Sequence, residues 1–376
     1  MSNNARYFPD NELPNKTQII KEHGKFIDLY FKPEDESIFG KNNISENFKD
    51  KREKKIEFKW TRIFRTEKLF SIDENDDIYK GLFSEDKCLN ETQGCLGNFY
   101  LITYLHNIKK SFPGIFYSII RECHPRDGYF EAYFYKEENR ELIKTITFVD
   151  DYVPNARIDN NLRSIFANYK KEEPEFINFM VGKYLLIEKA YAKRKGGYLN
   201  IKERITSNFD FLFELTGVKC HINYLTDYLL DYEGNEKKIS KEKFKKETIE
   251  NNKLNEKNKI KIFDKINNLL NDNLINVETE DVSFNGVKNT FGIWANHRYN
   301  LLNFEIHNKS LFFSLWNPYG KNPIGDNDYP RFENIQKRNE EGLGNGNIIL
   351  NFDRFFISFI RLIFQKKDEI LRIYKK

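Results

Sequence analysis

The chain has 376 residues, of which 61 are Lys or Arg and 57 are Asp or Glu, so its net charge is +4. A balance this close to neutrality predicts neither nucleic-acid binding nor attraction to an anionic membrane. The four cysteines show no Cys-x-x-Cys spacing, which indicates neither a disulfide framework nor a zinc site and makes a reducing, cytoplasmic setting the default. The N-terminus lacks the apolar core of a secretory signal, and the most apolar stretch, 355–364, is short and contains Arg361, so we expect no integral membrane segment.

Composition divides the chain into three parts. Residues 1–54 are polar and rich in Lys, Asn and Asp, and they predict an N-terminal extension with a few short elements that can dock on the body of the protein. Residues 55–212 are predicted to form a mainly helical subdomain, and residues 213–376 a strand-rich one. The polar stretch 235–261 has helical composition but few apolar residues, which indicates an exposed helix or an insertion.

Two apolar-faced helices are predicted in the helical part. The first covers 99–112 (FYLITYLHNIKKSF), where apolar residues recur every three or four positions. The second covers 175–198 and is stopped by the pair Gly196-Gly197. Between the two helices, the pattern predicts a strand pair with a polar turn at 137–140.

The strand-rich part contains the residues with the clearest catalytic potential. The segment FGIWANHRYNLLNFEIHNKSLFFSLWNPYG predicts two strands that turn at Asn308-Lys309, with His297 and Asn317 near their outer ends. A thiol protease places its nucleophile at a helix N-terminus and takes its base, with a group that orients the base, from a distant part of the chain. The helix that starts at Phe99 and the strand pair supply this arrangement, apart from the thiol.

Seven short segments carry a resemblance to one known family. They are QGCLGNFYLI (93–102), FVDDYVP (148–154), EKAYAKRKGGY (188–198), FELTGV (213–218), ANHRYNLL (295–302), LWNPYG (315–320) and NIILNFDRFFISF (347–359). In this order they resemble motifs of the catalytic domain of calpains, the papain-like calcium-dependent cysteine proteases. The likeness spans roughly residues 56–360, and EKAYAK and NPYG are its most specific parts.

The resemblance implies a papain-like α+β fold in which a helical and a strand-rich subdomain flank a cleft. It places Gln93 at the oxyanion position, His297 at the base position and Asn317 at the position that orients the imidazole. The nucleophile position is occupied by Phe99. Phenylalanine has no nucleophilic atom, so acyl-enzyme chemistry at this position is impossible.

Cys95 is the alternative nucleophile. It lies four residues before the helix start, in the loop that follows the oxyanion glutamine. Because an error of even ~1 Å in the position of a reacting group can lower a rate about a hundredfold, this displacement disfavours catalysis. A cysteine packed as a small hydrophobic residue in the loop is the simpler interpretation.

The calcium-binding pattern of the family is also altered. Asn90, Leu199 and Pro323 stand where the resemblance implies acidic ligands. Calcium prefers several oxygen ligands with net negative charge, so we expect no cofactor. Asp326 and Asp328 are weak candidates for a shifted calcium site, and an acidic surface turn is the simpler interpretation of them.

These departures predict a pseudoprotease that binds a peptide or protein partner in the cleft without cleaving it. One alternative is an active calcium-dependent cysteine endopeptidase that uses a non-standard thiol. The other is a structural scaffold protein, since surfaces that bind partners leave no signature in this sequence. The same reasoning gives a cytoplasmic location and no nucleic-acid partner.

Overall fold

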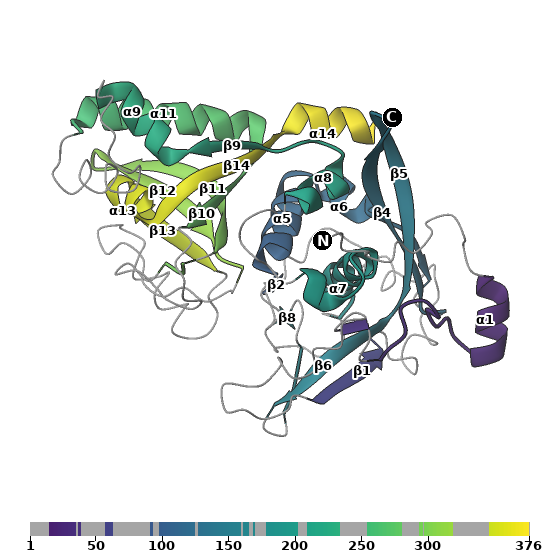
Figure 1. The fold of residues 1–376 in the computed structure, drawn as a ribbon. Helices are drawn as coiled ribbons and strands as arrows, with labels where there is room; N and C mark the ends of the chain where they lie inside the picture. The colour runs from purple at the N-terminus through teal and green to yellow at the C-terminus, as the bar shows by residue number, and fades with distance from the viewer. Residues whose placement is uncertain are drawn as a thin grey trace, which may run out of the picture. The chain divides into compact units, whose positions relative to one another are not determined.

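The structure is a computed structural model, and it describes residues 15–34, 37–38, 57–62, 91–92, 98–124, 127–158, 161–164, 168–169, 178–201, 209–233, 254–279, 293–295, 297–318 and 346–375. The chain divides into two compact units. The first unit comprises residues 1–105 and 112–204, and the second comprises residues 106–111 and 205–376. Helices and antiparallel sheets together confirm the predicted α+β fold class (Figure 1).

The two apolar-faced helices predicted from the sequence are confirmed. The first is α5, Phe99–Ser111, followed by the short helix α6, Pro113–Ser118. The second is α7, Asn178–Arg194. Gly196 and Gly197 follow α7 with φ angles of +79° and +146°. Residues other than glycine rarely adopt these backbone angles, so the helix ends here.

The predicted strand pair between these helices is also confirmed. It consists of β4, Tyr129–Glu138, and β5, Glu141–Asp150, and β3, Ile120–His124, extends it to a three-stranded antiparallel sheet. Asn139 and Arg140 form the tight turn with φ angles of 52° and 68°.

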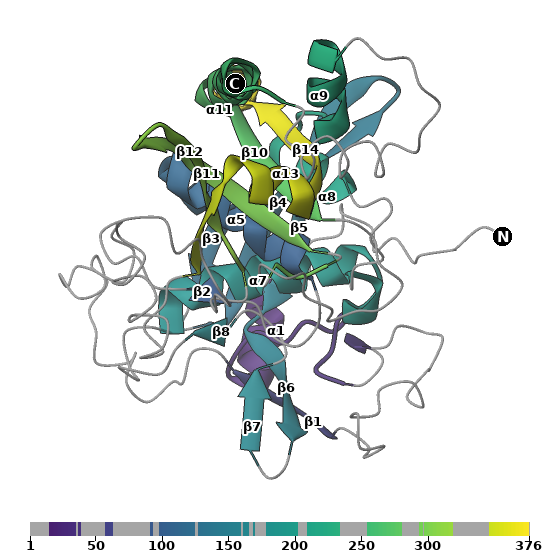
Figure 2. The same ribbon diagram turned by 90° about the vertical axis from the view of Figure 1, so that its left-hand side faces the viewer.

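The first unit contains more strands than its sequence predicts. A second sheet has the order β1-β6-β7, formed by Glu57–Arg62, Tyr152–Ile158 and Asn161–Ser164 (Figure 2). A further pair joins β2, Glu91–Thr92, to β8, Asn168–Tyr169. These strands are short, and β1 pairs with a strand about ninety residues later, so little in the local pattern reveals them.

The N-terminal segment contributes to the core of the first unit. Helix α1, Lys16–His23, is capped by the Asn15 side chain. Four buried apolar residues, Ile19, Phe26, Tyr129 and Phe148, form one cluster that joins this segment to β4 and β5. The Phe26 ring packs edge-to-face on Tyr129 with centroids 4.7 Å apart. Ile19, Phe26, Phe31 and Ile38 of this polar segment are therefore buried, whereas Leu29 and Tyr30 stay exposed.

The second unit is built on a six-stranded antiparallel sheet with the order β13-β12-β11-β10-β14-β9. The strands are β9 His221–Tyr224, β10 Asn273–Thr279, β11 Arg298–His307, β12 Ser310–Trp316, β13 Asn347–Asn351 and β14 Phe359–Lys366. Asn308 and Lys309 form the β11–β12 turn with φ angles of 47° and 68°, as the sequence predicts.

Helices accompany this sheet. They are α8 Asp210–Thr216, α9 Leu225–Glu233, α11 Glu256–Asp272, α13 Phe352–Ser358 and α14 Lys367–Tyr374. Among the helices in the described ranges, none is both long and apolar enough to cross a membrane.

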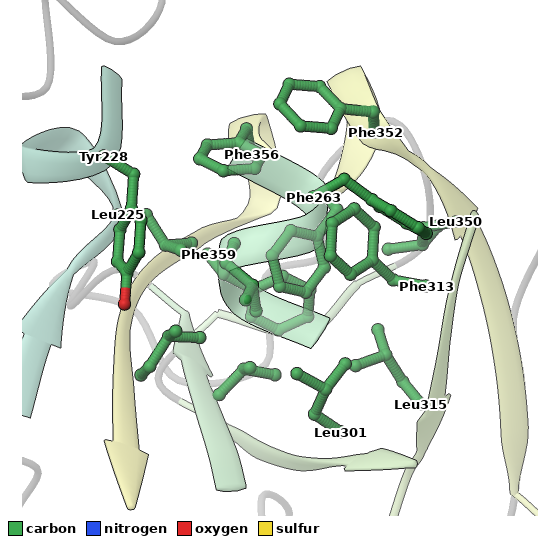
Figure 3. Close-up of a cluster of buried hydrophobic side chains, with 14 of the residues drawn as sticks. Leu225, Tyr228, Phe263, Leu301, Phe313, Leu315, Leu350, Phe352, Phe356 and Phe359 are labelled. Carbon is green, nitrogen blue, oxygen red and sulfur yellow. The ribbon is translucent and has the colours of Figure 1, made fainter. Parts of the chain in front are cut away.

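The two faces of the six-stranded sheet differ in chemistry. Directly opposed residues of antiparallel strands share a face, so the register assigns each side chain to one side. The apolar face packs against α9, α11 and α13 in one large cluster (Figure 3), where the Phe313 and Phe355 rings stack at 3.9 Å. The opposite face, here called the polar face, also carries the apolar residues Leu274 and Ile363. Its polar and aromatic residues are Asn276, Glu278, Arg298, Asn300, Trp316, Arg361 and Gln365.

Candidate active site

The β11–β12 strand pair brings His297 and Asn317 together. His297 directly precedes β11, and Asn317 directly follows β12. Asn300 opposes Trp316 in the ladder, so the outer ends of the two strands are adjacent. As a result, the His297 Nε2 atom lies 3.1 Å from the Asn317 Oδ1 atom.

This hydrogen bond selects one form of the imidazole. An amide oxygen only accepts, so Nε2 of His297 carries the proton and Nδ1 holds the lone pair in the neutral ring. Burial lowers the pKa of His297 to about 3, and the hydrogen bond with Asn317 opposes this effect only in part. A general base works best with a pKa near the working pH, so the buried imidazole is a weak base in this arrangement.

Two residues that the sequence did not single out hold His297. The His297 N–H donates to the Thr279 hydroxyl at 2.9 Å, and the Thr279 N–H donates to the His297 carbonyl at 3.0 Å. The Tyr299 ring packs edge-to-face on the imidazole with centroids 4.7 Å apart. Since Thr279 ends β10, only the strand register could have indicated its role.

Asn317 is held by Gly346. The Asn317 N–H donates to the Gly346 carbonyl at 2.8 Å. Gly346 has a φ of +81°, and a Cβ at this position would lie 2.5 Å from the Asn317 carbonyl oxygen. Both the backbone conformation and the close approach require glycine.

Gly346→Ala is therefore expected to lower the free energy of unfolding by about 2 kcal/mol or more, because a left-handed conformation alone costs an alanine roughly 1–2 kcal/mol. Urea unfolding followed by circular dichroism measures the change. Gly114→Ala in α6 is the matched control, because its Cβ would meet no atom within 4 Å, and it should be neutral or stabilising. Equal effects of the two substitutions would contradict the role given to Gly346.

Helix α5 begins at Phe99, and the residue before it is anchored. Asn98 is fully buried, and its amide donates to the Glu188 carboxylate in α7. The Leu101 N–H bonds to the Asn98 carbonyl at 3.0 Å, and the Tyr100 hydroxyl donates to the Ile201 carbonyl at 2.9 Å. These contacts fix the start of the helix within the first unit. The Phe99 side chain lies outside the described part of the structure.

The lysines of the EKAYAK segment form buried ion pairs in the same unit. Lys189 pairs with Asp150, and both side chains are fully buried. The Lys193 ammonium lies 2.7 Å from the Asp28 carboxylate and also donates to the Phe148 carbonyl at 2.9 Å. Thus α7 connects the N-terminal segment and β5 through its charged side chains.

A model of the calpain family of cysteine proteases matches residues 26–364. The chain belongs to the calpain family of cysteine proteases. The match includes the start of α5 and the His297–Asn317 pair, and it begins at Phe26, within the N-terminal segment that packs on the first unit. A search of curated proteins finds no match to the chain.

Several calpain-family positions predicted from the sequence lie outside the described residues. They are Asn90, Gln93, Cys95, Pro323, Asp326 and Asp328. Leu199 belongs to a short 3-10 helix, Tyr198–Ile201, but its side chain is outside the description as well. Within the described ranges, no group of three or more His, Cys, Asp or Glu side chains is arranged to hold a metal ion.

Proposed function

We propose that this calpain-family domain is a pseudoprotease that binds a peptide or protein partner without cleaving it. The observation that carries the proposal is Phe99, the first residue of α5, at the position where the family resemblance implies the nucleophilic cysteine. Without a thiol at this helix N-terminus no acyl-enzyme can form there.

The environment of His297 supports the same proposal. The imidazole is 1% exposed, neutral and bonded to Asn317, so the base and its orienting group are retained as a well-packed pair. With a pKa lowered to about 3, this histidine would take a proton from a nucleophile only weakly. A retained pair without a nucleophile fits a fold kept for binding.

The second candidate function is cleavage through a non-standard thiol. Cys220, between α8 and β9, is a free cysteine. Burial raises the pKa of its thiol, which disfavours the thiolate that a nucleophile needs. Cys95 is the thiol nearest in sequence to the nucleophile position and is the one to test, and a scaffold role would leave all thiols unreactive.

The proposed function includes no calcium, because Asn90, Leu199 and Pro323 replace the acidic ligands that the family resemblance implies. The test is incubation with casein and with a fluorescent casein peptide, with and without calcium. We expect saturable peptide binding and no cleavage in either condition. A thiol-directed peptide epoxide should label no cysteine in the folded protein.

Two variants make the outcome decisive. Cleavage that persists through purification and disappears in both His297→Ala and Cys95→Ala would establish the non-standard thiol and overturn the proposal. Absence of both cleavage and peptide binding would instead favour the scaffold role. Phe99→Cys alone is not expected to restore cleavage, because the His297 imidazole that would accept the thiol proton is buried.

A further inference from the structure

Three residues form a continuous row across the polar face of the second unit. In the ladder Asn276 of β10 opposes Asn300 of β11, and Asn300 opposes Trp316 of β12. All three side chains therefore lie on the same side of the sheet. Each is almost completely buried, with exposed fractions of 3% for Asn276, 0% for Asn300 and 3% for Trp316.

Two residues of α5, His106 and Asn107, contact this row or the strand that carries it. The His106 ring stacks on the Trp316 indole with centroids 3.8 Å apart and planes 7° from parallel. The Asn107 Nδ2 atom lies 3.3 Å from both the Ile275 carbonyl and the Asn276 Oδ1 atom. The segment 106–111 belongs to the second unit, so these contacts lie within one compact body.

Asn300 stands out in this row because its side-chain amide has no hydrogen-bond partner among the described residues. Neither its Oδ1 nor its Nδ2 makes a hydrogen bond to any residue that the structure describes. An asparagine amide offers two donors and an acceptor oxygen, and buried amides almost always use them, with protein groups or with ordered water. The two hydrogen bonds from the Asn107 amide to the β10 strand are long, at 3.3 Å each.

We propose that Asn300 is the centre of a buried hydration site, in which ordered water joins its amide to those of Asn276 and Asn107. The ligand must be small because the row is buried. It must also both donate and accept hydrogen bonds, because a side-chain amide has N–H donors and an acceptor oxygen. It must also be neutral. The nearest charges on the same face, Arg298 and Glu278, lie next along the strands and pair with each other at 2.7 Å.

The site has a structural consequence for α5. Residues 106–111 of this helix meet the sheet through one aromatic stack and a hydrated layer. The opposite face of the sheet is covered by the apolar cluster. Water with several polar partners is a fixed component of such layers. The hydration site thus completes the attachment of this part of the helix, independently of whether the domain binds a peptide.

The test uses the whole folded chain, deuterated and labelled with ¹⁵N-asparagine. We expect cross-peaks between water and the Asn300 side-chain amide with the sign of a long-lived water in nuclear Overhauser spectra. The amide of Asn303, an exposed residue of the same strand, is the internal control and should show only rapidly exchanging water. Absence of a long-lived water at Asn300 would overturn the proposal.

Substitution adds an independent readout. Asn300→Leu should remove the cross-peaks. The midpoint of urea unfolding should be equal to or below that of the original protein, because the substitution removes an amide whose hydrogen bonds are made by water. A clear rise in the midpoint would show that the amide is dry and unpaired, and would overturn the proposal. If the leucine variant does not fold, Asn300→Ser serves to assign the signals, and the decisive spectrum remains that of the unsubstituted chain.

Discussion

Asp28→Asn is expected to lower the free energy of unfolding of the first unit by about 3–5 kcal/mol, because it leaves a buried ammonium without its counter-charge. The Asp28 carboxylate lies 2.7 Å from the Lys193 Nζ atom, and side-chain exposures are 0% and 3%. Burial lowers the pKa of Lys193, and Asp28 opposes that shift. Without Asp28 the lysine must either stay charged in the core or release its proton, and both outcomes cost stability.

The matched control is Glu138→Gln, which removes the charge of an exposed pair in the same unit. Glu138 lies 3.3 Å from Lys136, with side-chain exposures of 55% and 31%, so the expected loss is below about 1 kcal/mol. Trp60 fluorescence, in a chain with Trp294→Phe and Trp316→Phe, follows urea unfolding of the first unit alone. If the two substitutions have equal effects, the Asp28–Lys193 pair does not hold the N-terminal segment in the core.

Lowering the pH from 7.5 to 5.0 is expected to remove about 4 kcal/mol of stability from the second unit, about 2 kcal/mol for each of two buried histidines. Burial lowers the pKa of both His106 and His297 from 6.5 to about 3. The unfolded chain then takes up protons at a higher pH than the folded chain. The stabilisation is fully present above pH 6.5 and is lost as the pH falls from 6.5 toward 3.

Urea unfolding at a series of pH values measures this loss, and variants assign it. His106→Asn and His297→Asn should each reduce the pH dependence by about half, since each removes one of the two titrating groups. His221→Gln, at an exposed position in β9, is the matched control. A stability that stays constant between pH 7.5 and 5.0 would contradict the burial of both imidazoles.

The sequence alone determined the local elements and the family. Helical spacing predicted α5 and α7, Gly196-Gly197 marked the end of α7, and Asn308-Lys309 marked the β11–β12 turn. These signals are local, because each depends on residues within a few positions of one another. The ordered motifs likewise predicted the calpain family, which the match over 26–364 confirms.

Only the tertiary structure decided which side chains meet and which are buried. Thr279 is 18 residues from His297, and Glu188 is 90 residues from Asn98, so no local pattern pairs them. Asp28 lies in the polar N-terminal extension, where no local pattern predicts which side chains are enclosed, and it is fully buried. Burial and long-range pairing depend on how the whole chain packs, and they set both the ion pairs and the pKa of His297.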